Sequence, residues 1–261
     1  MLLCIDVGNT NIVLCMYRGD ELVTHWRVST DSQKMPDEYG VLLLELLATR
    51  QMTVGQIDGV ILASVVPPVT DLVTEMLQAY VGREPLIVGA GIKTGVAVRY
   101  DSPRDVGADR IVDAAAAYKL YGGPACIVDF GTATTFNALA ANGDYLGGAI
   151  APGVRVAAEA LFQRTAKLPR IDLRRPKHAI GSNTVEAMHS GILWGYVGLV
   201  EGMVARFRKE LGDDMRVIGT GGLSGLIAEE TDVFDVVDPW LTLKGLKIIW
   251  DLNRGPERGD A

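Results

Sequence analysis

Cysteine is scarce in this sequence, since only Cys4, Cys15 and Cys126 occur among 261 residues. Each lies in or beside an apolar, strand-like run, and their spacing is not that of metal ligands. We therefore expect three buried thiols in a reducing compartment. The first residues already have the pattern of a strand, with no basic leader and no cleavage signal, so we expect a cytoplasmic protein.

Basic residues are fewer than acidic residues. The chain has 32 acidic and 25 basic residues, which gives a formal net charge of −7. This balance argues against nucleic acid or an anionic membrane as the main partner. The longest apolar candidate for a membrane span, Ile192 to Val200, is far too short for a bilayer.

Two common catalytic signatures are missing as well. No Gly-x-x-x-x-Gly-Lys-Ser/Thr run is present, which excludes a P-loop enzyme, and no Gly-x-Ser-x-Gly elbow is present, which argues against a hydrolase. The three histidines, His25, His178 and His189, are scattered, and we interpret them as structural or surface residues. The chain is long enough for one large or two modest domains.

An apolar strand that ends in small polar residues opens the chain. Leu2 to Ile5 leads into Asp6-Val7-Gly8-Asn9-Thr10-Asn11. Gly8 lets the backbone approach a ligand closely, and the next three side chains offer hydrogen-bond donors. A carboxylate repels phosphate, so we expect Asp6 to hold a cation or water between itself and phosphate oxygens. The alternative is an ordinary hairpin turn.

The same pattern recurs in the second half as Ile127-Val128-Asp129-Phe130-Gly131-Thr132-Ala133-Thr134. Each copy is followed by a turn that contains Gly and Asp, at residues 18–22 and 142–146. One short turn often matches by chance, but a turn together with its downstream hairpin does so much less often. The sequence therefore predicts a duplicated domain whose two phosphate turns face each other as a clamp around ATP.

Hydrophobic periodicity predicts the order strand-strand-strand-helix-strand-helix-strand for the first half, which is typical of a mixed sheet covered by helices. In the second half a helix is expected from Val154 to Phe162, and the long helix from Val185 to about Leu211. A loop-like basic segment lies between them, at residues 164–179, and we interpret it as a solvated surface.

Four glycines recur along one side of the long helix. Gly191, Gly195, Gly198 and Gly202 are spaced by four, three and four residues, which puts them in one stripe. Each glycine costs a helix about 1 kcal/mol relative to alanine. We therefore expect another helix or a second subunit to pack closely against this stripe.

A carboxylate at the start of a helix lies between the two repeats. Gly107-Ala108-Asp109-Arg110 opens an alanine-rich helix. The helix dipole and the Arg110 guanidinium are expected to keep Asp109 ionised and ready to accept a proton. In phosphoryl transfer such a group orients the attacking hydroxyl. From the loop alone, a simple helix cap fits equally well.

With Asp6 to Asn11, Gly107 to Arg110 and Asp129 to Thr135 in place, the chain resembles the type III pantothenate kinases over essentially its whole length. Asp-x-Gly turns mark only the wider superfamily of actin, Hsp70 and sugar kinases, whereas the Gly-x-Asp-Arg loop narrows the resemblance to this family. The resemblance implies an α/β fold of duplicated ribonuclease-H-like domains of the actin/Hsp70 ATPase type, with mixed sheets and flanking helices. Its expected halves are residues 1–118, with the first turn and the substrate loop, and 119–261, with the second turn and a long dimerisation helix.

The resemblance also implies an activity, namely ATP-dependent phosphorylation of pantothenate to 4′-phosphopantothenate, the first step of coenzyme A biosynthesis. Asp109 would be the catalytic proton acceptor, with Mg²⁺ near Asp6 and a monovalent cation, K⁺ or NH₄⁺, at Asp129. ATP would contact Asp6, Val7, Gly8, Asn9, Thr10, Asn11, Ile12, Val13 and Thr132. Pantothenate would contact Tyr100, Gly107, Ala108, Asp109, Arg110 and Thr184, near the subunit interface of a homodimer.

Two alternatives stay open. The first is a kinase of the same superfamily that acts on another hydroxylated small molecule. The second is a non-catalytic, nucleotide-binding regulatory homologue, such as a transcription accessory factor, which would bind ATP without transfer to pantothenate. The acidic balance and the lack of a DNA-reading element count against this second alternative.

Overall fold

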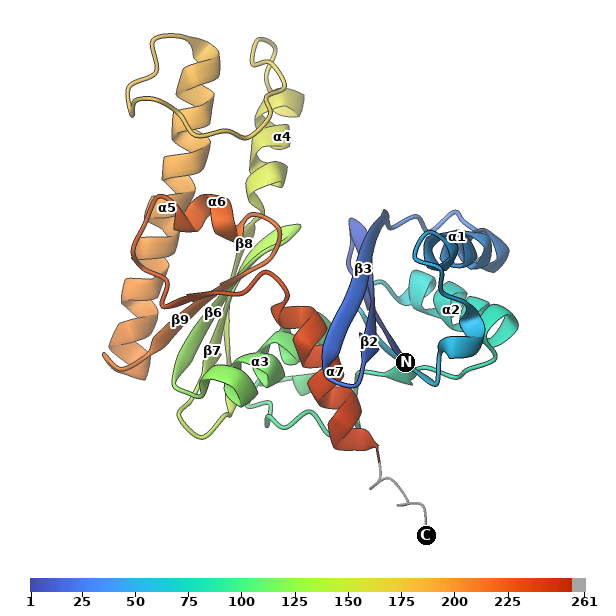
Figure 1. Ribbon diagram of the computed structural model, residues 1–261. Coiled ribbons are helices and arrows are strands. Elements are labelled where there is room, and N and C mark those ends of the chain that lie inside the picture. Colours follow the sequence, from blue (N-terminus) through green and yellow to red (C-terminus); the bar gives the residue numbers. More distant parts are fainter. Residues whose placement is uncertain (255–261) are drawn as a thin grey trace. The chain divides into compact units, whose positions relative to one another are not determined.

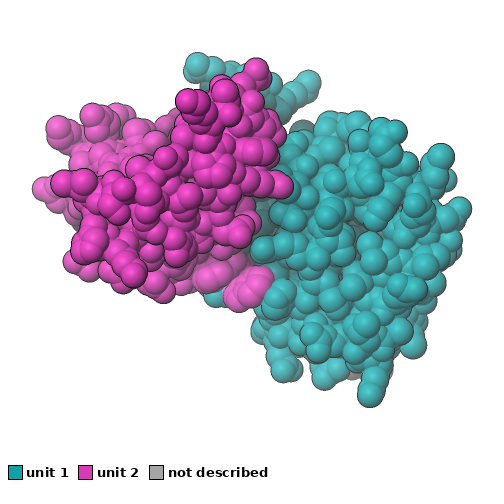
Figure 2. Space-filling view, turned by 90° about the horizontal axis from the view of Figure 1, so that it is seen from above, with its two compact units in different colours: residues 1–96, 101–119, 242–261 teal, residues 97–100, 120–241 magenta. Residues whose placement is uncertain are grey.

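The computed structural model describes residues 1–254 as two compact units (Figure 2). Unit 1 comprises residues 1–96, 101–119 and the described residues from Thr242 onward, and unit 2 comprises residues 97–100 and 120–241. Each unit is built on one five-stranded sheet with its own apolar core. No helix within residues 1–254 combines the length and the apolar character needed to cross a membrane.

Unit 1 has a mixed sheet with the strand order β3-β2-β1-β4-β5. Its strands are β1 (Leu2–Val7), β2 (Asn11–Arg18), β3 (Glu21–Ser29), β4 (Gly59–Ser64) and β5 (Leu86–Ile87). The first three strands are antiparallel, whereas β4 is parallel to β1 and β5 is parallel to β4. The helices α1 (Pro36–Ala48) and α2 (Pro67–Met76) pack against one face, with a π-helical turn at Leu77–Val81 (Figure 1).

Both faces of this sheet are covered, which explains why β1 is an almost continuous apolar run. Leu3, Ile5 and Val7 belong to the core shared with α1 and α2. The other face contacts α7 (Leu241–Asn253), where the ring of Trp250 lies against the backbone of Gly59. A Cβ on Gly59 would lie 2.2 Å from that ring, so only glycine fits at this position.

Unit 2 repeats the plan with the strand order β10-β9-β6-β7-β8. Its strands are β6 (Ala125–Phe130), β7 (Ala133–Leu139), β8 (Tyr145–Pro152), β9 (Arg216–Thr220) and β10 (Val236–Val237). Its helices are α4 (Val154–Arg164), α5 (Thr184–Leu211) and α6 (Ser224–Ala228). The upper parts of α4 and α5 extend beyond the sheet in Figure 1.

The two sheets have the same topology. The order β8-β7-β6-β9-β10 matches β3-β2-β1-β4-β5 strand for strand, with the same parallel and antiparallel pairs. The helices follow the strands in the same order in both repeats. The position of α1 in the first repeat is taken by α4 and α5 in the second, and that of α2 is taken by α6. The last helix is α3 (Ala108–Tyr121) in the first repeat and α7 in the second. The predicted duplicated ribonuclease-H-like fold, with mixed sheets and flanking helices, is confirmed.

The compact units differ from the predicted halves, 1–118 and 119–261, at the last helix. We expected α7 with the second half, but it belongs to unit 1 because it packs on α3. The Thr242 hydroxyl donates a hydrogen bond to the Asp113 carboxylate at 2.7 Å. A Cβ on Gly245 would lie 2.3 Å from the Val112 carbonyl oxygen, so the two helices approach through backbone.

A short segment before α3 also departs from the predicted halves. Residues 97–100 were expected in the first half, but they belong to unit 2. The Tyr145 amide donates to the Ala97 carbonyl, and the Arg99 amide donates to the Tyr145 carbonyl, both at 2.8 Å. The Arg99 guanidinium also pairs with Asp144 at 2.9 Å. These bonds fix the segment along the start of β8.

The basic segment before α5 is fastened to unit 2 by ion pairs. Its arginine side chains are exposed, as expected for a solvated surface. Each of three arginines nevertheless has a carboxylate partner: Arg170 pairs with Glu159 at 3.0 Å, Arg174 with Glu186 at 2.6 Å, and Arg175 with Glu230 at 2.7 Å. The cluster therefore holds a loop against α4, α5 and the end of α6.

Candidate active site

The first predicted turn joins β1 to β2. Asp6 is the penultimate residue of β1 and is half-buried, whereas Asn9, Thr10 and Asn11 are exposed. The Gly8 amide donates to the Asn11 carbonyl at 3.0 Å and closes the turn. In the sheet Asp6 stands beside Val13 of β2 and Ala63 of β4.

The second predicted turn has the same position in unit 2. Asp129 is the penultimate residue of β6, and the Gly131 amide donates to the Ala133 carbonyl at 3.0 Å. Thr132 is exposed at its tip. This turn is one residue shorter, because residues 131–132 join the strands here and residues 8–10 join them in unit 1.

Two threonines flank Asp129 in the sheet. Thr135 of β7 and Thr220 of β9 are its register partners, and register partners on neighbouring strands point to the same face. The Thr135 hydroxyl accepts a hydrogen bond from Asn137 at 3.0 Å. Within the described residues, the buried Thr220 hydroxyl has no hydrogen-bond partner.

The glycine after β9 makes room for the Asp129 carboxylate. Gly221 has a left-handed backbone with φ +86°, and a Cβ on it would lie 2.3 Å from Asp129 Oδ1. From the sequence, Gly219-Thr220-Gly221-Gly222 at the end of a predicted strand is expected to let backbone approach a flat ligand closely. In the structure, Gly221 admits a side chain of the protein itself.

The surroundings of Asp129 fit the monovalent cation that the resemblance implies. A carboxylate and an unpartnered hydroxyl on one face of the sheet supply the oxygen ligands that hard cations prefer. The resemblance also implies Mg²⁺. Within residues 1–254, however, no three His, Cys, Asp or Glu side chains come together in a way that could hold a metal ion. A single carboxylate such as Asp6 suits Mg²⁺ only together with substrate phosphates and water.

Asp109 lies in the first turn of α3, and its environment differs from the expected one. Its carboxylate accepts a hydrogen bond from the Arg110 amide at 2.7 Å. Burial raises the pKa of Asp109, and the opposing effect of Arg110 is smaller. Burial therefore opposes the expected effect of Arg110 on this carboxylate, and the depth of the site could not be read from a local motif. The capping alternative stays open, because the Asp109 carboxylate accepts from an amide in the first turn of α3, which begins at Ala108.

Gly107 allows the Asp109 carboxylate to fold back over the loop. A Cβ on Gly107 would lie 2.5 Å from Asp109 Oδ1 and 3.2 Å from Val65 Cγ1. Val65 follows β4, and its amide donates to the Val7 carbonyl at the end of β1. The structure therefore brings the Asp109 loop and the first turn to the same end of the unit 1 sheet.

The remaining predicted pantothenate contacts belong to unit 2. The Tyr100 ring lies over Gly147 of β8, where a Cβ would be 3.1 Å from the ring and φ is +121°. Thr184 is the exposed first residue of α5, and the Asn183 side chain caps this helix by accepting from the Glu186 amide at 3.0 Å. The predicted start of the helix is confirmed to within one residue.

Several residues around these turns were missed by the sequence reasoning. Thr135 and Thr220 lie in strand-end motifs for which the sequence predicts no role for them, and the sequence gives no reason to select Gly147. The signal for Thr220 was present, since a Gly-Thr-Gly-Gly end of a strand resembles the other two turns. Its pairing with Asp129 depends on a register between distant strands, which a single sequence does not reveal.

Comparisons with known proteins show which family the chain resembles. The family model described as type III pantothenate kinase matches residues 2–206. A curated type III pantothenate kinase from Moorella thermoacetica is 54% identical over 253 residues, which cover 97% of this chain and 100% of that protein.

Solved structures show the same fold at low identity. A conserved protein assigned to the Baf family of transcriptional activators, from Campylobacter jejuni, superposes with a TM-score of 0.62 at 19% identity, covering 96% of this chain and 98% of that one. A protein assigned as a 2-dehydro-3-deoxygalactonokinase from Sinorhizobium meliloti gives a TM-score of 0.59 at 13% identity and covers both chains fully. These two likenesses show the fold alone. The family model and the relative at 54% identity show more: the chain belongs to the type III pantothenate kinase family.

Proposed function

We propose that this protein transfers the γ-phosphoryl group of ATP to pantothenate, giving 4′-phosphopantothenate and ADP in the first step toward coenzyme A. The observation that carries the proposal is the Asp109 carboxylate at the start of α3, beside the ends of β1 and β4, in a chain of this family. The enzyme is proposed to work in the cytoplasm, in keeping with three free and buried cysteines.

Asp109 is the proposed proton acceptor. The primary hydroxyl oxygen of pantothenate attacks the γ-phosphorus and forms a P–O bond, while the bond from that phosphorus to the bridging oxygen of ADP breaks. The hydroxyl proton passes to the Asp109 carboxylate. Burial raises the pKa of this carboxyl, which makes it a stronger base than an exposed aspartate.

The two turns are proposed to bind ATP phosphates, residues Asp6 to Val13 from unit 1 and Thr132 from unit 2. Asp6 would hold Mg²⁺ through the phosphates, and Asp129 with Thr220 would hold K⁺ or NH₄⁺. Both ions supply positive charge that stabilises the phosphate oxygens. Gly107, Ala108, Arg110, Tyr100 and Thr184 are the proposed pantothenate contacts.

A homodimer is part of the proposal, and the glycine stripe of α5 is its proposed contact. Gly191, Gly195 and Gly198 are exposed, and a Cβ on any of them would meet no neighbouring atom of the described residues within 4 Å. A second subunit is therefore a better candidate for this face than another helix of the same chain. Sedimentation of Gly195→Leu tests this proposal, because a large side chain in the contact should shift the protein toward monomers.

A coupled assay of ADP release tests the function. Wild-type protein should release ADP only when pantothenate is present, and more rapidly in K⁺ or NH₄⁺ buffer than in Na⁺ buffer. Activity on another hydroxylated compound, with pantothenate inert, would favour a different kinase. ATP binding without any transfer would favour a regulatory homologue.

A further inference from the structure

The first turn is tied to the rest of unit 1 by Thr30, the first residue after β3. The Thr30 hydroxyl donates a hydrogen bond to the Gly8 carbonyl at 2.6 Å. The Thr30 amide donates to the Thr10 carbonyl at 3.0 Å. A single residue therefore fixes two carbonyl groups of the turn.

This arrangement determines where two amides of the turn point. In a planar trans peptide, the C=O and N–H groups point in opposite directions. The Gly8 carbonyl shares its peptide with the Asn9 amide, and the Thr10 carbonyl shares its peptide with the Asn11 amide. Because both carbonyls point toward Thr30, both amides point away from it. Backbone amides that are held in a fixed direction and converge on one point can bind an anion.

Thr30 is itself held by the core of unit 1 through the next residue. The Tyr39 hydroxyl donates to the Asp31 carbonyl at 2.8 Å and accepts from the Asp31 amide at 3.0 Å. Tyr39 belongs to α1 and is only 4% exposed. The position of Thr30 is therefore set by the packed helix as well as by the turn.

In unit 2, the residue at the corresponding position makes the backbone hydrogen bond but has no hydroxyl group to make the second one. Gly153 is the first residue after β8, and its amide donates to the Thr132 carbonyl at 3.1 Å. A Cβ on Gly153 would lie 2.2 Å from that carbonyl oxygen, so no side chain fits there. Gly153 therefore holds the second turn through its backbone amide alone, whereas Thr30 also uses its hydroxyl.

We propose that Thr30 is a positioning residue for ATP, which acts by orienting the first turn so that its amides meet the phosphates. The inference rests on the proposed function of that turn. Thr30 acts through the turn and does not take part in proton transfer. Its loss should weaken nucleotide binding and leave pantothenate binding unchanged.

Two substitutions separate the hydroxyl from the shape of the side chain. Thr30→Val keeps the shape and removes the hydrogen bond, whereas Thr30→Ser keeps the hydroxyl. Loss of one such bond predicts an increase in the KM for ATP of about three- to tenfold in Thr30→Val. Thr30→Ser should stay within about twofold of wild type, and the KM for pantothenate should be unchanged in both. Tyr39→Phe, which removes the bonds to Asp31, should raise the KM for ATP in the same direction.

The inference is overturned if Thr30→Val and Thr30→Ser have the same affinity for ATP, whether both match wild type or both are weakened. Calorimetric titration with ATP and melting temperatures are measured on the same samples. If wild-type protein binds ATP but shows no pantothenate-dependent ADP release, the proposed function fails. The titrations then still decide whether the Thr30 hydroxyl orients the turn for the nucleotide.

Discussion

The two repeats place an aspartate at the same point of the same sheet but surround it differently. Asp6 stands between Val13 and Ala63, which offer no side-chain oxygen, whereas Asp129 stands between Thr135 and Thr220. A lone carboxylate suits an ion that keeps waters and phosphates as its other ligands, as Mg²⁺ does. A carboxylate between hydroxyls suits an ion held largely by the protein. The duplicated scaffold thus surrounds its two equivalent aspartates with different side chains.

The repeats also differ in the helix that comes after their last short strand. In the first repeat, α3 begins with the Asp109 loop beside the first turn, whereas α7 of the second repeat packs on α3 through Gly245. The proposed proton acceptor therefore belongs to the first repeat, and the corresponding helix of the second repeat packs against the helix that carries it. Substitutions in each repeat can test these differences.

Asp109→Asn should have the largest effect on activity, since it removes the proposed proton acceptor of the first repeat. Loss of a general base predicts a fall in kcat of about 10²–10⁴-fold. Burial raises the pKa of Asp109, so the folded state binds this proton more tightly than the unfolded state, and stability falls as pH rises toward the folded pKa. At neutral pH the neutral amide should therefore leave the melting temperature equal or higher. A correctly folded variant with wild-type rate would exclude Asp109 as the base.

Gly153→Ala tests the tie that the two repeats share. A Cβ here would lie 2.2 Å from the Thr132 carbonyl oxygen and 2.6 Å from that of Gly131. Overpacking against backbone predicts a loss of about 1–3 kcal/mol in the free energy of unfolding, measured in urea. Gly225→Ala is a matched control, because a Cβ on Gly225 meets no atom of the described residues within 4 Å. Equal stability of the two variants would show that the second turn can shift freely.

Thr220→Val tests the proposed cation site. Loss of one oxygen ligand should raise the K⁺ concentration for half-maximal activity by about tenfold, while the KM for pantothenate stays unchanged. Thr134→Val is the control, since Thr134 is also buried with an unpartnered hydroxyl among the described residues but pairs with Phe130 of the core, on the opposite face from Asp129. An equal shift in both variants would contradict the site.

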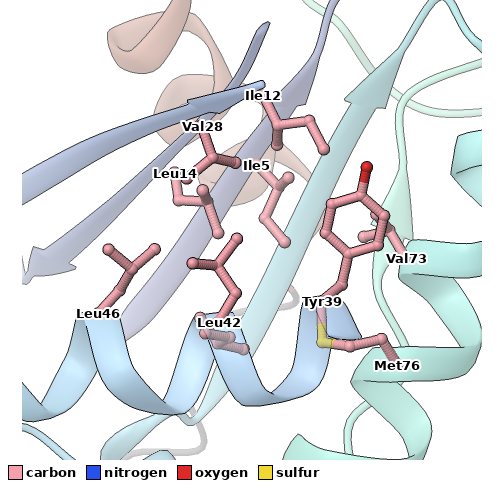
Figure 3. A pocket seen from close by; sticks show the side chains of 10 residues that line it. Ile5, Ile12, Leu14, Val28, Tyr39, Leu42, Leu46, Val73 and Met76 are labelled. Atoms are coloured by element: carbon pink, nitrogen blue, oxygen red, sulfur yellow. The ribbon is translucent and has the colours of Figure 1, made fainter. Parts of the chain in front are cut away.

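The smallest effect is expected from filling a cavity beneath the first turn. Side chains from the sheet, α1 and α2 line a small, partly open cavity of about 20 Å³, and the lining includes Ile5, Ile12, Tyr39 and Val73 (Figure 3). Val73→Ile adds one methylene group, which predicts a gain of at most about 0.8 kcal/mol in the free energy of unfolding. Calorimetry should show a slightly higher melting temperature and an unchanged KM for ATP. A lower melting temperature would mean that the cavity cannot accept the added group.

Much of the fold could be predicted because its signals are local. The Asp-x-Gly turns, the order of strands and helices in the first half, and the start of α5 all depend on neighbouring residues. The packing of α7 on α3, the pairing of Asp129 with Thr220 and the burial of Asp109 depend on contacts between distant segments. That is why the compact units differ from the predicted halves and the burial of Asp109 was not predicted, although the motifs themselves could be located.

The most direct test of the central claim is to identify the product that wild-type protein makes from ATP and pantothenate in K⁺ buffer. Mass spectrometry and ³¹P NMR should show ADP and 4′-phosphopantothenate in equal amounts, with the phosphoryl group on the primary hydroxyl. Pantothenate that remains unmodified while the protein binds ATP, or hydrolyses it to ADP and free phosphate, would contradict the account.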